Sequence, residues 1–193
     1  MFLYYLLNKN IFFEFDKLKY FGKNSIIGKT VRIRHPELCT IGDNSIIDDF
    51  TYISTKIEVG DYVHMASNNT IGGGKDFLFK IGSFSGISSG VRIYCSGNLF
   101  EKSIISAAVP VEFQDNISGN VIMEEFTGIG ANAVILPNVT LQEGSAVGAL
   151  SIVLPNQKLE KWTLYAGIPA KPIKKRDKAN ILEKYEKFKN QKK

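Results

Sequence analysis

A repeat of six residues constrains this chain more than any other feature of its sequence. Within three uninterrupted stretches, every sixth side chain is apolar. These positions are Ile41, Ile47, Ile53, Val59, Met65 and Ile71, then Ile81, Ile87 and Ile93, and finally Ile129, Ile135, Leu141, Val147, Val153 and Leu159. An α-helix or a coiled coil repeats in fewer than four residues, and a flat sheet repeats in two. None of these explains a period of six.

Two further positions of the repeat are restricted. The residue after the apolar one is often glycine, at Gly42, Gly60, Gly72, Gly82, Gly130 and Gly148. The fifth position is small or β-branched at Ser45, Thr51, Val63, Ser85, Val91, Ala133, Val139, Ser145 and Ser151. We interpret each hexad as one side of a three-sided parallel β-solenoid, in which glycine lets the backbone turn at the corner. The alternative, turn glycines of a β-sandwich, does not account for a constant six-residue phase.

Three such hexads make a coil of 18 residues. Each coil should stack on the previous one at the strand spacing of about 4.8 Å, with the apolar residue pointing into a narrow core. Residues 18 apart, such as Ala131 and Ala149, should therefore lie above one another. The sequence predicts an all-β solenoid.

Composition excludes several other classes of protein. With 193 residues, 44% of them hydrophobic and 22% charged, the chain has the size and apolar content of one globular domain. The two cysteines, Cys39 and Cys95, exclude a disulfide framework or a cysteine-rich zinc fold. Two histidines, His35 and His64, cannot supply a site of three imidazoles from one chain. We expect no metal site.

The net charge of +5 is concentrated at the C-terminal end. Residues 171–193 carry ten basic and three acidic side chains, whereas the rest of the chain is nearly neutral. A nucleic-acid-binding protein usually spreads basic charge over a folded face, so we expect no nucleic-acid partner. The basic segment indicates either a local contact with phosphates or a solvated helix.

No apolar run is long enough to span a membrane. The apolar stretch Met1–Leu7 ends at Asn8, and it lacks the basic region and cleavage site of a signal peptide. We therefore expect a soluble protein of the cytoplasm.

The hexads, followed by the sequence YAGIPAKP at 165–172, resemble those of the hexapeptide-repeat acyltransferases with a left-handed β-helix. The resemblance extends from about residue 22 to residue 176. It implies a left-handed winding, an exception to the usual right-handed crossover of parallel strands. The repeat is interrupted at 96–120, and the resemblance implies that this segment is an excursion loop that leaves the coils. We expect the β-helix domain at 22–172.

The two ends of the chain carry apolar patterns of their own. A capping arm or helix is predicted at 1–21 from apolar residues at Leu3, Leu6, Leu7, Phe13, Phe15 and Leu18. A basic amphipathic helix is predicted at 173–193, with one apolar face formed by Ile181, Leu182, Tyr185 and Phe188.

Other stretches resemble a subgroup of bacterial acetyltransferases that modify sugars. These stretches lie at 41–50, 62–66, 109–113 and 147–151. The resemblance implies an acetyl-CoA-dependent acetyltransferase acting on the amino group of a dTDP-linked dideoxy amino sugar, for surface polysaccharide or lipopolysaccharide synthesis. O-acetylation of a polysaccharide or oligosaccharide hydroxyl is the alternative within this class. The family also implies a homotrimer, with each active site between two subunits.

The excursion loop departs from the family pattern. Many relatives have an acidic pair and an aromatic residue shortly after the position of Tyr94, but this chain has Cys95, Ser96, Gly97 and Asn98. Glu101 is the only acidic residue nearby. Asn98 and Glu101 are therefore candidates to bind the substrate, and the substrate here can differ from that of the relatives.

Acyl transfer needs a group that takes a proton from the acceptor, and histidine suits this role near neutral pH. His64 matches the histidine of the family and precedes the core residue Met65, so we expect it at a corner, as a base or acceptor-orienting residue. A purely structural corner histidine is the alternative. His35, next to Pro36, indicates a loop.

Three acidic residues, Asp48, Asp49 and Asp61, could orient a base or a ligand, although solvated corner acids are the alternative. Asn68 and Asn69 are candidates to hold sugar hydroxyls, or corner residues that tolerate a left-handed backbone.

Small side chains in the later coils would let the pantetheine arm of acetyl-CoA lie close to the backbone. By position and resemblance these are Gly130, Ala131, Gly148, Ala149 and Ser151, although a corner can require a small residue for its own packing. Lys171 and Lys174 could meet the phosphates of the cofactor as point charges.

Two functions of other classes fit the sequence less well. A non-catalytic binding or structural β-helix would present a regular array of one exposed residue type, and the sequence contains none. A metal-dependent hydratase of the solenoid type would need three histidines at the subunit boundary, which two histidines cannot easily supply.

Overall fold

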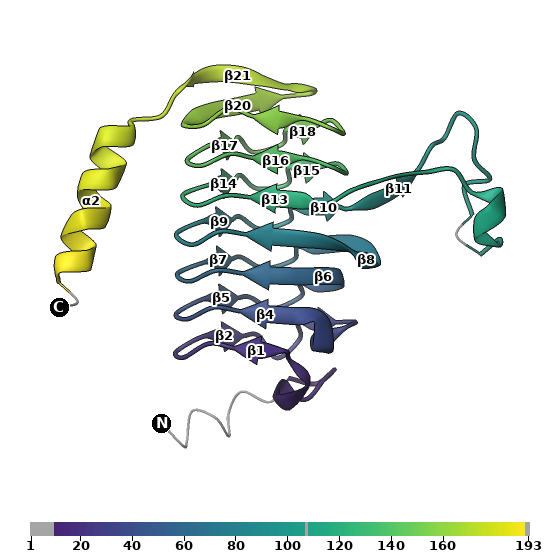
Figure 1. Ribbon diagram of the computed structural model, residues 1–193, viewed down its shortest axis with the longest axis horizontal. Coiled ribbons are helices and arrows are strands. Elements are labelled where there is room, and N and C mark those ends of the chain that lie inside the picture. The colour runs from purple at the N-terminus through teal and green to yellow at the C-terminus, as the bar shows by residue number, and fades with distance from the viewer. Residues whose placement is uncertain (1–9, 107, 192–193) are drawn as a thin grey trace.

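The computed structural model describes residues 10–106 and 108–191. The chain winds into stacked coils, and each complete coil contributes a short strand to each of three flat faces (Figure 1). We name these faces A, B and C in the order in which the chain meets them. Strands β6 and β8 run through a corner and join faces A and C into one hydrogen-bonded sheet. This arrangement confirms the predicted β-solenoid.

The strands divide among the faces as follows. Face A holds β1 (Tyr20–Phe21), β4 (Cys39–Ile41), the second halves of β6 (Tyr52–Val59) and β8 (Thr70–Ile81), β13 (Val121–Met123), β16 (Thr140–Leu141) and β19 (Lys158–Leu159). Face B holds β2 (Ile26–Ile27), β5 (Ile46–Ile47), β7 (His64–Met65), β9 (Gly86–Ile87), β14 (Gly128–Ile129), β17 (Ala146–Val147), β20 (Thr163–Gly167) and β21 (Ala170–Lys175). Face C holds β3 (Arg32–Ile33), the first halves of β6 and β8, β10 (Arg92–Tyr94), β15 (Val134–Ile135) and β18 (Ile152–Val153).

Uninterrupted coils stack at a step of 18 residues. Ile46 pairs with His64, and Gly128 pairs with Ala146. At the predicted contact between Ala131 and Ala149, the next amide, that of Leu150, donates to the Ala131 carbonyl at 2.9 Å. Where the repeat is interrupted the step lengthens: His64 pairs with Gly86, and Gly86 pairs with Gly128. The extra residues leave the coil and the register then resumes.

The repeat positions form the core. All fifteen apolar residues of the six-residue repeat are buried, with exposed fractions between 0% and 5%. Each coil is a triangle of three short strands whose inward-pointing side chains fill its interior, and further buried residues such as Ile57, Phe79 and Met123 complete the packing. The prediction from periodicity is confirmed at every position.

The fifth hexad position has a hydrogen-bonding role in addition to its small size. Ser45 accepts a hydrogen bond from the amide of Val63 in the next coil at 3.0 Å and donates to the Gly60 carbonyl at 2.9 Å. Ser85 repeats this pattern with the amide of Thr127 at 3.0 Å. These hydroxyls satisfy backbone groups that the corners leave without a strand partner.

The repeat glycines serve a different purpose from the predicted one. The left-handed turn residues at the corner between faces A and B are Asn24, Asn44, Tyr62, Phe84, Phe126, Gly144 and Trp162. Gly42 and Gly60 have no such φ angle, but a β-carbon on Gly42 would lie 2.5 Å from the carbonyl carbon of Gly60 in the next coil. Glycine is needed there so that adjacent corners can approach closely, and the turn itself uses other residues.

The C-terminal helix α2 (Lys178–Asn190) begins later than predicted, because residues 170–175 form β21 and pair antiparallel with β20. Four turn residues, Tyr62, Phe84, Phe126 and Trp162, form an aromatic ladder along one corner, with successive ring centroids 5.1, 5.6 and 6.1 Å apart. Tyr185 of α2 packs edge-on against Phe84 at 4.9 Å and Phe126 at 5.1 Å. The apolar side of the helix therefore packs against the coils.

The described part of the N-terminal segment contacts the first coil. The Asn10 amide donates to the carbonyls of Gly28 and Val31, and a 3-10 turn spans Phe15–Lys17. The predicted apolar positions before residue 10 lie outside the described residues. A second 3-10 turn, Pro36–Leu38, lies between the first two coils.

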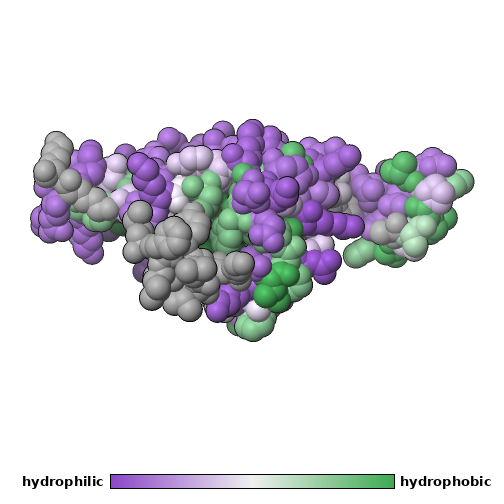
Figure 2. Space-filling view, turned by 90° about the horizontal axis from the view of Figure 1, so that it is seen from below, coloured by the Kyte–Doolittle hydropathy of each residue, from purple (hydrophilic) through white to green (hydrophobic). Residues whose placement is uncertain are grey.

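The excursion loop leaves the coils after β10. It begins and ends as an antiparallel pair, β11 (Ser96–Asn98) with β12 (Asn116–Ser118), and includes a 3-10 turn at Val111–Phe113. Figures 1 and 2 show it projecting from the solenoid, with apolar side chains gathered at its outer end. More than half of the surface of each of these is exposed: Phe100, Ile104, Ile105, Val111 and Phe113.

Candidate functional site

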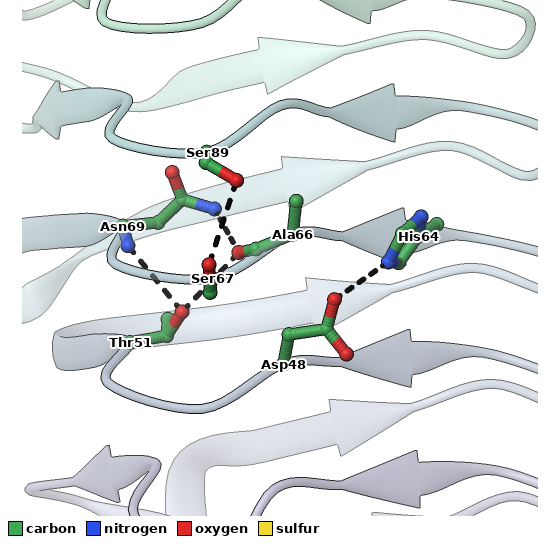
Figure 3. Close-up of polar contacts among 7 residues, drawn as sticks. All are labelled: Asp48, Thr51, His64, Ala66, Ser67, Asn69 and Ser89. Carbon is green, nitrogen blue, oxygen red and sulfur yellow. Dashed lines mark hydrogen bonds and ion pairs between the residues drawn. The ribbon is translucent and has the colours of Figure 1, made fainter.

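An exposed histidine and aspartate pair lies on face B. The Nε2 atom of His64 on β7 is 2.9 Å from Oδ2 of Asp48, which follows β5 in the coil below (Figure 3). The side chains are 58% and 43% exposed, so both can reach a bound molecule. His64 lies on the flat face and not at the predicted corner, because the turn is completed at Tyr62.

The pairing fixes which nitrogen of the imidazole is available. Since an ionised carboxylate only accepts hydrogen bonds, Nε2 of a neutral His64 carries the proton and donates it to Asp48. The lone pair is then on Nδ1. Asp48 therefore holds the ring in the tautomer in which Nδ1 can accept a proton.

A groove of about 540 Å³ extends along face B from His64 toward the C-terminal coils. Its lining residues are His64, Ala66, Gly86, Ile87, Ser88, Ser89, Gly128, Ile129, Gly130, Ala146 and Val147. Directly above His64 in the strand register come Gly86, Gly128 and Ala146. Because these outward-facing positions have little or no side chain, the backbone of face B is accessible along the groove.

Two lysines lie on the same face beyond the groove. Lys174 of β21 pairs with Leu164, which pairs with Ala146, and Lys171 pairs with Ala166. Five strand steps of about 4.8 Å separate β7 from β21, or roughly 24 Å in total. Face B thus combines a proton acceptor, a groove with small side chains and two exposed cations.

The predicted cofactor residues have two different environments. Gly130 lines the groove, and Gly148 follows the next strand of face B. Ala131 and Ala149 lie at the following corner, where Ala149 is exposed. Ser151 is buried, donates to the Ala149 carbonyl and accepts the Gly167 amide at 3.0 Å. The expectation that Ser151 contacts the cofactor is wrong, because its hydroxyl is bonded inside the chain.

Asn68 and Asn69 form a corner. Asn68 has a left-handed φ of 62°, and its carbonyl accepts from Arg92 at 2.7 Å. Asn69 is 1% exposed, and its side-chain amide donates to the Ala66 carbonyl (Figure 3). Its side-chain oxygen accepts the Val91 amide at 2.7 Å. Asn69 cannot bind sugar hydroxyls as predicted, because it connects adjacent coils from the interior.

Asn98 and Glu101 belong to the excursion loop. Asn98 lies in β11, and Glu101 follows it in the chain and is exposed. The loop that contains β11 projects from the side of the solenoid opposite β7 (Figure 1). Within one chain, these two residues do not meet His64.

Four other titratable residues, Cys39, Cys95, Asp49 and His35, do not line the groove. Burial raises the pKa of Cys39 to about 12 and that of Cys95 to about 11, and both thiols are free. Hydrogen bonds from the Thr30 amide and hydroxyl lower the pKa of Asp49 at a corner. Nδ1 of His35 lies 3.7 Å from Oε1 of Glu37 in the loop around Pro36.

Two negative findings concern residues 10–106 and 108–191. No cluster of three or more His, Cys, Asp or Glu side chains in these ranges could hold a metal ion. None of the helices formed there is long and apolar enough to cross a membrane.

The sequence indicated Asp48 only as one of several acidic residues that could orient a base. Gly86 and Gly128 were not identified as site residues. The two glycines were missed because the insertions add residues between paired strands, so that His64 and Gly128 are 64 residues apart in the sequence but only two strands apart in space. Aligning the hexads across the insertions would have revealed this neighbourhood.

Comparisons with known proteins agree with the fold. The family described as bacterial transferase hexapeptide (six repeats) matches residues 38–73. A dTDP-4-amino-4,6-dideoxy-D-glucose acyltransferase of Escherichia coli is 37% identical over 173 residues, which cover 87% of this chain and 80% of the relative.

Crystal structures of AntD, an N-acyltransferase from Bacillus cereus, are also similar. A point mutant in complex with dTDP-4-amino-4,6-dideoxyglucose and coenzyme A has a TM-score of 0.86 and 31% identity, covering 94% of this chain and 99% of that chain. AntD in complex with dTDP and 3-hydroxybutyryl-CoA has a TM-score of 0.85 and 31% identity, and the match covers 95% of this chain and 100% of that chain.

A hexapeptide-repeat acetyltransferase from Vibrio cholerae, with 20% identity and a TM-score of 0.54, shares the fold over 83% of this chain and 75% of that one. These likenesses confirm the predicted left-handed parallel β-helix. The identity to the Escherichia coli enzyme extends over most of both chains. The chain therefore belongs to the hexapeptide-repeat acyltransferases, enzymes that use coenzyme A thioesters.

Proposed function

We propose that this protein transfers an acyl group from a coenzyme A thioester to the amino group of a dTDP-linked 4-amino-4,6-dideoxy sugar. The observation that carries the proposal is the His64–Asp48 pair at the end of a groove lined by small residues. Support for the substrates comes from the Escherichia coli relative, named for such a sugar, and from AntD, crystallised with this sugar nucleotide and coenzyme A.

His64 acts as the general base in this proposal. The acceptor nitrogen bonds to the thioester carbonyl carbon while Nδ1 of His64 takes the proton that the amine loses. The carbon–sulfur bond then breaks, and the imidazolium gives the proton to the departing sulfur. Asp48 orients the ring through Nε2 and stabilises the imidazolium by its negative charge.

The groove and the two lysines suit a long thioester donor. The small side chains at Gly130, Gly148 and Ala149 leave backbone accessible for an extended arm. Lys171 and Lys174 supply positive charge at the far end of the same face, where phosphates of the donor would be held as point charges. The acyl end then lies near His64.

The acceptor side requires a neighbouring subunit. Asn98 and Glu101 are remote from His64 in their own chain, and the excursion loop exposes five large apolar side chains. A homotrimer in which this loop covers the groove of the next chain would bury these side chains and bring Asn98 and Glu101 to the acceptor. Acetyl is the simplest acyl group, and the product would enter surface polysaccharide or lipopolysaccharide. The reaction belongs to the cytoplasm, in agreement with two free cysteines.

The test is acyl transfer from acetyl-CoA to dTDP-4-amino-4,6-dideoxyglucose, followed by mass spectrometry of the sugar nucleotide. We expect an acetylated product with the wild-type protein. His64→Ala should lower kcat by about 10²–10⁴-fold, the usual contribution of a general base. Asp48→Asn should lower kcat less, because the imidazole remains. His35→Ala is the matched control and should keep the wild-type rate.

A wild-type rate in His64→Ala would remove the histidine from the mechanism while leaving the enzyme class intact. Product on a polysaccharide hydroxyl, with none on any amino sugar nucleotide, would overturn the proposed acceptor in favour of O-acylation.

A further inference from the structure

Gly86 and Gly128 differ from the repeat glycines whose β-carbon would collide with the next coil. A β-carbon on Gly130 would lie 2.4 Å from the backbone nitrogen of Ala149, so that position must be glycine. A β-carbon on Gly86 would meet only the His64 carbonyl oxygen, at 3.7 Å, and one on Gly128 only the Gly86 carbonyl oxygen, at 3.9 Å. Neither glycine has a positive φ. The fold of this chain has room for a side chain at both positions.

Glycine at these positions also lowers stability. Both residues lie within strands, β9 and β14, where glycine loses more conformational entropy than alanine and packs nothing against its neighbours. Since neither spacing nor backbone conformation requires glycine, the packing of the chain does not explain its presence.

Their location offers an explanation. Gly86 pairs directly with His64, and Gly128 pairs with Gly86, so the two form the part of the groove next to the imidazole. The exposed His64–Asp48 pair independently marks this end of the groove as the reacting end. The space left by the two absent side chains is therefore beside the thioester, on the donor side of the reaction.

We propose that Gly86 and Gly128 form an acyl pocket and that the enzyme accepts an acyl group of the size of 3-hydroxybutyryl as well as acetyl. The proposal rests on the proposed function, because it assumes a thioester donor in this groove. The transfer is unchanged: the acyl carbon leaves sulfur, bonds to the sugar nitrogen, and the amine proton passes to sulfur. The two glycines determine only which acyl chain fits.

The experiment compares two donors and three variants. The kcat/KM for acetyl-CoA and for 3-hydroxybutyryl-CoA is measured with dTDP-4-amino-4,6-dideoxyglucose as acceptor. The wild-type protein should use both donors. Gly86→Ala and Gly128→Ala should each lower kcat/KM for the larger donor at least about tenfold relative to acetyl-CoA, since one methyl group in a pocket changes discrimination by about 10–200-fold. Their melting temperatures should equal or exceed that of the wild type.

Gly72→Ala is the matched control. Gly72 is also a strand glycine without a positive φ, and its β-carbon would lie 3.6 Å from the Tyr94 ring, an ordinary contact. It lies on face C, outside the groove. This variant should keep the wild-type preference between the two donors.

Three results would overturn the acyl pocket: a wild-type enzyme that uses acetyl-CoA alone, an equal loss for both donors in the two variants, or no change in either. Calorimetric titration of each donor, without acceptor, separates this proposal from the proposed function. If no sugar nucleotide is acylated, the proposed acceptor fails. The pocket then stands only if Gly86→Ala and Gly128→Ala weaken binding of 3-hydroxybutyryl-CoA more than binding of acetyl-CoA.

Discussion

Burial separates the reactive side chains of this protein from the unreactive ones. His64 and Asp48 lie on the outer face of a strand pair, where solvent and ligands reach them. Cys39 and Cys95 point into the solenoid and are 0% exposed, and burial raises the pKa of both thiols because the thiolate would lose its hydration. Residue type alone does not distinguish the exposed reactive side chains from the buried unreactive ones. The alternation of inward and outward positions along each strand does.

We predict that neither cysteine reacts with a thiol reagent in the folded protein at pH 8. With a pKa of about 12 for Cys39 and about 11 for Cys95, the reactive thiolate is scarce at that pH, and the reagent cannot reach the core. A colorimetric thiol titration should count no fast-reacting group in the native protein. The same titration in guanidinium should count two. Fast labelling of the native protein would contradict the packing of these residues.

Among the larger elements, helix α2 depends on the aromatic ladder for its position. Its ion pairs, such as Lys187 with Glu183, lie on the exposed side, where they contribute little to stability. Tyr185 instead contacts two rings of the ladder. Arg176, just before the helix, donates to the carbonyls of Phe126 and Gly144 at 2.8 and 2.6 Å. These contacts hold the helix against coils that are distant in sequence.

Tyr185→Ala should therefore lower the free energy of unfolding by about 1–3 kcal/mol, through loss of apolar burial and of two edge-on ring contacts. Urea denaturation followed by circular dichroism would measure the change. Lys187→Ala, on the exposed side of the same helix, is the control and should change stability by less than about 0.5 kcal/mol. Equal stability of the two variants would show that α2 does not contribute through the ladder.

For the whole molecule, the excursion loop is the feature that a single chain leaves unexplained. Its outer end exposes Phe100, Ile104, Ile105, Val111 and Phe113, an apolar group unlike the scattered apolar residues of an ordinary surface. In the proposed homotrimer, the loop would cover the groove of the next subunit.

We predict a sedimentation mass of three chains for the wild-type protein. The trimer of the double variant Val111→Ser, Phe113→Ser should dissociate at a higher protein concentration than the wild-type trimer and should lose acyl transfer. The reason is that burial of these side chains would hold the loop on its neighbour. Phe50→Ser is the control, since Phe50 is 70% exposed at a corner outside the loop. A monomeric wild-type protein with full activity would refute the shared site.

The sequence by itself determined the solenoid and its core. All fifteen apolar positions that the six-residue period predicted are buried, because a repeated triangle of short strands needs an inward apolar residue on each side. It also selected His64 as the candidate base. The division of the chain at residues 21 and 172 stays a prediction.

Only the tertiary structure decided which residues surround His64. Asp48 becomes a neighbour of His64 because adjacent coils stack. Gly86 and Gly128 become neighbours because the two insertions leave the solenoid and the strand register resumes after each of them. It also showed that asparagines and aromatic residues make the turns, and that Ser151 and Asn69 are bonded inside the chain. The reason is general: a periodic sequence specifies which side chains point inward, whereas contacts between coils depend on how many residues each coil contains.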